Sequence, residues 1–153
     1  MSSFEISRSE TINADASRVH GLINDFHEWP TWSPWEDVDP NLQRIYTGPD
    51  SGVGAHYAWQ GNRKAGQGSM EITSSTPEQI AIVLSFLKPW KATNDVTFTL
   101  TPTGSGTEVT WRMTGEHKGV GAVLNKVFNM DKLIGKDFEK GLTRLKATAE
   151  TAA

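Results

Sequence analysis

The chain has 153 residues, a net charge of −3 at pH 7, 37% hydrophobic residues and no cysteine. This length suits one domain over residues 1–153 with a buried core, while the missing cysteines exclude disulfides, thiol catalysis and thiolate metal ligands. The sequence has no basic run, no apolar signal segment and no apolar run of ~20 residues, so we expect a cytoplasmic protein with neither a nucleic-acid partner nor a membrane span.

The first part of the chain predicts one strand and one short helix. Alternating apolar residues from Phe4 to Ile12 indicate a strand. Asp15 is a helix-capping residue, and the apolar spacing after it predicts a short helix over Ala16 to Asp25. The stretch from His27 to Pro40 contains several prolines and is expected to form a loop or a pair of helical turns.

The middle of the chain predicts six further strands joined by short turns. Each run is alternating or strongly apolar, and Gly, Pro and Asn are frequent between the runs. The predicted strands are Leu42–Thr47, Val53–Gln60, Gly68–Ser75, Gln79–Leu87, Thr93–Thr101 and Thr107–Gly115. Short turns suit antiparallel neighbours, so these runs predict a wide antiparallel sheet that twists and curls.

The strongest structural signal is a long helix from Met130 to Glu150, which follows a predicted short helix over Val123 to Phe128. Residues at three- and four-residue spacing form its apolar stripe: Ile134, Phe138, Gly141, Leu142, Leu145 and Ala149. A terminal helix with one apolar face must bury that face, and the sheet is the available partner. We therefore predict an α+β fold, a seven-stranded curved antiparallel sheet that grips the C-terminal helix, with short helices between its first and second strands.

Several short motifs occur along the chain in a specific order. They are Ile12-Asn-Ala-Asp15, Trp29-Pro-Thr-Trp32-Ser-Pro-Trp35, Gly52-Val-Gly-Ala55, Gly66-Gln-Gly68, Gly106-Thr107 and Asp137-Phe138-Glu139-Lys140-Gly141-Leu142. Their order and spacing resemble the helix-grip (SRPBCC) superfamily of START lipid-transfer domains, birch-pollen allergen proteins and polyketide cyclases, and above all its bacterial polyketide cyclase/dehydrase-like branch. The resemblance covers nearly the whole chain. It implies a cavity between sheet and helix for a lipid-, sterol- or polyketide-like ligand, but little about a reaction.

A set of large side chains is expected to line this cavity. Those expected to point inward are Tyr57, Trp59, Met70, Phe86, Trp111, Met113 and Phe138, and those expected near the mouth are Trp32, Trp35, Trp90 and Phe128. Aromatic residues and Met more often fill a core than line a pocket, so each also has a plain core interpretation. Trp29, Trp32 and Trp35 recur at every third residue, where they either gate the cavity or close the open end of the sheet. Tyr57 is the expected polar contact and the first candidate for a catalytic group, because its hydroxyl can donate and accept.

The titratable residues form no recognisable active site. The histidines are His20, His27, His56 and His117. They make no HxH or HxxxH pair, and no GxSxG motif occurs, so we expect no metal site, no cofactor and no serine nucleophile. His56 has the opposite strand parity to Tyr57 and is expected to face away from the helix.

Three functions stay open at this level. The leading interpretation is a protein that binds a small hydrophobic or aromatic molecule in the cavity. The second is an aromatase, cyclase or dehydratase that uses the same cavity, with Tyr57 as acid or base. The third is a protein-interaction module like the chaperone-ATPase activators of the same superfamily, which would have a filled core and an exposed apolar patch. Neither the ligand nor the oligomeric state follows from the sequence.

Overall fold

The structure, a computed structural model, describes residues 2–33, 41–61, 66–88, 92–117 and 130–151. Its strands are β1 (Ser2–Ile12), β2 (Gln43–Thr47), β3 (His56–Gln60), β4 (Gln67–Thr76), β5 (Gln79–Lys88), β6 (Ala92–Pro102) and β7 (Thr107–His117). Its described helices are α1 (Ala16–Ile23), the 3-10 helix η1 (Phe26–Thr31) and α3 (Met130–Thr151). The element order is the expected one: a strand, helical turns, six strands and a long helix.

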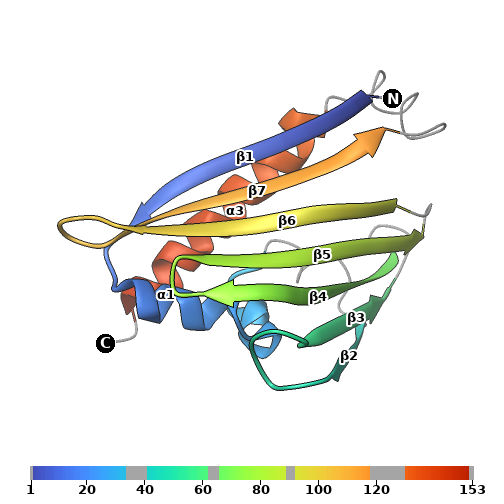
Figure 1. The fold of residues 1–153 in the computed structure, drawn as a ribbon, viewed down its shortest axis with the longest axis horizontal. Coiled ribbons are helices and arrows are strands. Elements are labelled where there is room, and N and C mark those ends of the chain that lie inside the picture. The colour runs from blue at the N-terminus through green and yellow to red at the C-terminus, as the bar shows by residue number, and fades with distance from the viewer. Residues whose placement is uncertain (1, 34–40, 62–65, 89–91, 118–129, 152–153) are drawn as a thin grey trace.

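All seven strands form one antiparallel sheet in the order β1-β7-β6-β5-β4-β3-β2. Strands β2 to β7 follow one another across the sheet, and β1 returns to lie beside β7. Figure 1 shows α3 crossing one face of the sheet, while α1 lies at the end of the sheet where α3 finishes. The predicted α+β class, the seven strands and the terminal helix are thus confirmed.

The strand predicted to begin at Val53 is shorter in the structure. Gly52 and Gly54 adopt φ angles of 79° and 96°, the left-handed conformation that favours glycine. They bend the chain into a turn that is held by a 2.9 Å hydrogen bond from the Gly54 N–H to the Ile72 carbonyl. Strand β3 therefore begins at His56.

From residue 135 onward, helix α3 buries the face that its periodicity predicts, while the Ile134 side chain lies outside the described part. Its buried residues are Phe138, Gly141, Leu142, Leu145 and Ala149. Gly135 is buried as well, because the Arg8 guanidinium of β1 takes the space above it; a Cβ there would lie 2.1 Å from Arg8 Nη2. Arg8 Nε also donates a 2.8 Å hydrogen bond to Glu139 Oε2, one turn further along α3. The stripe and this ion pair hold α3 against the sheet, beside β1.

The last turn of α3 is tied to the end of β1 through Glu150. Its carboxylate accepts hydrogen bonds from Lys146 Nζ at 2.5 Å and from the backbone N–H of Asn13 at 2.8 Å. Lys146 Nζ also donates to the Thr11 carbonyl at 3.1 Å. The Lys146 bond first, and the Asn13 bond second, hold the pKa of the Glu150 carboxyl below its usual value of 4.5.

Replacing Glu150 by Gln is expected to lower the free energy of unfolding at neutral pH. A carboxyl whose folded-state pKa is depressed stabilises the fold above its unfolded pKa, and this contribution is lost as the pH falls through the folded pKa. The difference between wild type and Glu150→Gln should therefore be present at pH 7 and shrink below about pH 4.5. Urea unfolding at several pH values measures it, with the exposed-turn variant Glu78→Gln as control; a difference that does not change with pH would contradict this account.

Candidate functional site

Five aromatic side chains fill the interior between the sheet and α3. This aromatic plug consists of Trp29, Trp32, Phe98, Trp111 and Phe138, all of them buried. The ring of Phe138 on α3 stacks on Trp111 of β7 with centroids 4.1 Å apart and an interplanar angle of 9°. Phe98 of β6 stacks on Trp111 as well, at 4.9 Å. The helix and the sheet are in direct contact at this level, so no ligand space is left between them.

Trp29 of η1 and Trp32, the residue that follows η1, are oriented by the end of α1. Trp29 Nε1 donates to the Ile23 carbonyl and Trp32 Nε1 to the Leu22 carbonyl, both at 2.9 Å. Carbonyls in the last turn of a helix lack intrahelical partners, so the indoles satisfy them. The two indoles lie against each other, with ring centroids 4.5 Å apart. Trp32 is thus placed at the centre of the core, not near a cavity mouth as expected.

Further along the concave face, the sheet is less completely covered. Four residues here keep a small solvent-exposed fraction: 8% for Tyr57, 9% for Met70, 8% for Leu84 and 7% for Asn94. They are register neighbours on β3, β4, β5 and β6, and so form one continuous row. Trp59 of β3 and Phe86 of β5 follow beside this row and are half-buried. We call the six residues the half-open patch: Tyr57, Trp59, Met70, Leu84, Phe86 and Asn94.

Trp59 is the flat surface of the half-open patch. Its register partner is Gly68, where a Cβ would lie 2.7 Å from Trp59 Cη2 and 2.4 Å from the Ser85 carbonyl oxygen. The indole therefore lies across the glycine. Its ring stacks beside Tyr57 at 6.1 Å and meets Phe86 edge-on at 5.9 Å. These contacts hold the indole of Trp59 in a fixed position, and the side chain is half-buried.

Tyr57 lies at the boundary between this patch and the helical turns. Its ring is 5.2 Å from Tyr46 of β2 and 5.9 Å from Phe26 of η1. The Tyr57 ring is thus surrounded mainly by other aromatic rings. This placement agrees with the expectation that Tyr57 points inward from β3.

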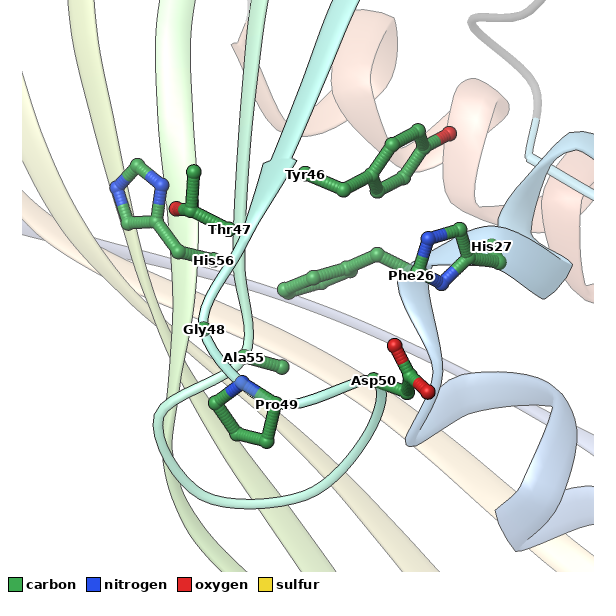
Figure 2. Close-up of a pocket in the computed structure, with 9 residues that line it drawn as sticks. All are labelled: Phe26, His27, Tyr46, Thr47, Gly48, Pro49, Asp50, Ala55 and His56. Carbon is green, nitrogen blue, oxygen red and sulfur yellow. The ribbon is translucent and has the colours of Figure 1, made fainter.

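A small hollow adjoins Tyr46 on the β2 side (Figure 2). Its volume is about 70 Å³, room for about two water molecules. The His27 ring stacks on Tyr46 at 4.2 Å, and its Nδ1 lies 2.8 Å from Asp25 Oδ1. Figure 2 shows His56 on the other side of the strands from Tyr46, as its parity predicts. The hollow is too small for an organic ligand.

A wider surface hollow of about 320 Å³ lies between α1 and the β4–β5 turn, lined in part by His20 and Ser75. Ser75 Oγ donates to Asn24 Oδ1 at 2.7 Å and lies 3.3 Å from His20 Nε2. Since the hydroxyl proton is directed to Asn24, His20 can only donate to Ser75. A base that activates a serine nucleophile has the opposite polarity, so this pair does not form a catalytic dyad.

The predicted site residues divide into three groups. Tyr57, Trp59, Met70 and Phe86 belong to the half-open patch. Trp32, Trp111, Met113 and Phe138 are buried in the core. Trp35, Trp90, Phe128 and the predicted helix over 123–128 lie outside the described residues.

Sequence reasoning missed Asn94 and Leu84. Asn94 has the same strand parity as Val96 and Phe98, so a polar residue at an inward position was visible in the alternation. Leu84 lies in the strongly apolar run of β5, where alternation does not separate the two faces.

The described ranges contain neither a membrane-spanning helix nor a metal-binding cluster. None of their helices is both long and apolar enough to cross a membrane. Within the same ranges, His, Asp and Glu side chains nowhere gather in groups of three or more that could hold a metal ion.

Comparison with protein families gives one match over almost the whole chain. A family model described as polyketide cyclase / dehydrase and lipid transport matches residues 3–150. No curated protein matches the chain.

Solved structures share the fold at low sequence identity. The di-domain ARO/CYC StfQ from the steffimycin biosynthetic pathway is 12% identical, with a TM-score of 0.71 over 97% of this chain and 51% of that chain. The Aha1 dimer from Colwellia psychrerythraea is 15% identical, with a TM-score of 0.67 over 97% of both chains. A protein from Thermus thermophilus is 19% identical, with a TM-score of 0.67 over 98% of this chain and 99% of that chain. At such identities the likeness shows the fold alone.

The plug and the patch are expected to differ in their importance for stability. Trp32→Ala should lower the free energy of unfolding by about 3–5 kcal/mol, because it leaves a cavity and removes the donor to Leu22. Trp59→Ala should cost less, roughly 1 kcal/mol, since the ring is only half-buried. Urea unfolding followed by far-UV circular dichroism compares the two variants. Equal losses of unfolding free energy in the two variants would mean that the aromatic plug and the half-open patch form one core.

Proposed function

The chain belongs to the polyketide cyclase/dehydrase and lipid transport family, and on this premise we propose that it binds a small hydrophobic or aromatic molecule against the half-open patch. The observation that carries the proposal is the unequal burial of the concave face. The row of Tyr57, Met70, Leu84 and Asn94 retains exposure, whereas the next row, Ile72, Ile82, Val96 and Met113, is closed.

The composition of the half-open patch suits such a ligand. Small-molecule sites are mostly apolar and aromatic, with a few polar groups that orient the ligand. Four of the six patch residues are apolar or aromatic without a strong polar group, and the two aromatic rings of Trp59 and Phe86 are half-buried already. Met70 adds a flexible side chain that adapts to irregular shapes.

The aromatic plug supports the same location. It closes the interior at Trp111 and Phe138, so a ligand has to bind toward the other end of the concave face. The described ends of β3, β5 and β7 lie at that end, because the strands alternate in direction. A ligand against Trp59 and Phe86 is therefore close to the ends of these strands, where entry needs the least rearrangement of the core.

The protein-interaction alternative has less support. Among the described residues, the large apolar side chains that are exposed are Ile45, Val53 and Leu87. Ile45 is on β2 and Leu87 is on β5, with two strands between them. Scattered apolar side chains are normal on a protein surface and do not make a docking patch.

Ligand binding is tested with a flat apolar probe, 2-methylnaphthalene, titrated into the purified protein and followed by calorimetry. We expect saturable binding, and we expect Trp59→Ala to weaken it about tenfold through lost stacking and contact area. The matched control is Ile45→Ala, which removes an exposed apolar residue outside the patch and should leave the affinity unchanged. Absence of binding, or equal affinity in wild type and Trp59→Ala, would rule out this site.

The cyclase or dehydratase alternative uses the same patch and differs in the role of Tyr57. If the Tyr57 hydroxyl transfers a proton, Tyr57→Phe should lower kcat on a polyketide-like substrate by about 100-fold or more with little change in KM. If the protein only binds its ligand, the same variant should lose affinity a few-fold. Turnover that is unaffected by Tyr57→Phe would exclude Tyr57 as the catalytic group.

A further inference from the structure

A single inward-facing amide interrupts the apolar row of the half-open patch. Asn94 is only 7% exposed, although a primary amide is among the groups that proteins bury least readily. It faces inward because its β5 partner is Leu84, and because Val96 and Phe98 follow it on the same side of β6. Its chain neighbours Thr93 and Asp95 are exposed on the outer side. Strand parity thus forces the amide onto the ligand-binding face.

The Asn94 amide makes no hydrogen bond to any group in the described part of the chain. Primary amides can donate twice and accept twice, and buried ones are almost always satisfied by protein or water. As far as the described residues are concerned, both of its N–H groups and its carbonyl are therefore available on the concave face. Neither amide atom is among the buried side-chain atoms without a partner in the described ranges, so the amide reaches solvent and is accessible to a ligand.

The sheet neighbours of Asn94 are small or apolar. Asp95 pairs with Thr114 in the β6–β7 register, which places Asn94 beside Gly115. Glycine contributes no side chain to the face, and on the other side the neighbour is the apolar Leu84. The inward-facing cation Arg8 is already engaged by Glu139 on α3. The site therefore offers neutral hydrogen bonding in an apolar setting.

From this arrangement we infer that Asn94 determines ligand specificity, by binding a hydroxyl or carbonyl group on an otherwise flat, apolar molecule. The inference rests on the proposed function and deepens it, since it selects neutral oxygenated aromatic molecules over plain hydrocarbons. Tyr57 and Asn94 stand at the two ends of the row, three strands or about 14 Å apart, with Met70 and Leu84 between them. The ligand thus has a polar end at Asn94 and an apolar body that extends toward Trp59.

The test compares two probes of similar size, 2-naphthol and 2-methylnaphthalene, in wild type and in Asn94→Leu. Leucine has the same branched arrangement of four side-chain heavy atoms as asparagine but cannot form hydrogen bonds. The ratio of the 2-naphthol affinity to the 2-methylnaphthalene affinity should fall about tenfold in Asn94→Leu, because only the naphthol loses a partner. Thr93→Leu, a change on the outer face of the same strand, is the matched control and should leave the ratio unchanged.

Three other results would overturn the inference, and they differ in what they imply for the binding site. An unchanged ratio, with both probes still bound, removes the role of Asn94 and leaves the proposed binding site intact. Failure of both probes to bind wild type removes the site and the inference together. The ligand-free stability of Asn94→Leu should equal or exceed that of wild type, because an unpartnered amide does not support the fold. A marked loss of stability in both Asn94→Leu and Asn94→Ala would make the amide structural and overturn its role in specificity.

Discussion

The stacking of Phe138 on Trp111 is the contact on which the rest of the structure depends. The two rings lie 4.1 Å apart and 9° from parallel, one on α3 and the other on β7. Phe98 and Trp32 pack around the pair and complete the closed part of the interior. Protein interiors are packed at close to crystal density, and aromatic rings are rigid. The separation of helix and sheet is therefore determined at this point.

The same stack determines where the sheet remains accessible. A strongly twisted sheet and a nearly straight helix are in full contact over only part of their length. At Trp111 the two layers meet, whereas toward Leu84 and Asn94 the inner face keeps some exposure. The filled interior and the half-open patch are thus two consequences of one packing contact. Family membership explains this fold, while any chemistry depends on the side chains of the patch.

Part of the candidate site could be predicted from the sequence. Strand alternation identified Tyr57, Trp59 and Met70 as inward-facing, and the structure brings them together. Trp32 was expected near the mouth or closing the open end of the sheet, and its ring lies in the core, where its Nε1 donates to the Leu22 carbonyl. Asn94 was missed because a polar residue in an alternating strand is usually assigned to solvent. Its inward position follows from its parity with Val96 and Phe98, and the register with Leu84 agrees with it.

The sequence by itself determined the order of the elements and the face of most residues in the alternating strands and the long helix. Alternation and turn residues predicted seven strands, and the spacing from Met130 onward predicted the helix and its buried stripe. Only the tertiary structure decided which inward residues are enclosed. Trp111 and Trp59 are the same residue type at inward strand positions. The first is fully buried beneath Phe138, whereas the second is only half-buried. Parity decides which face a side chain joins, but its burial depends on the distance to the layer opposite, and that distance is a property of the whole packed molecule.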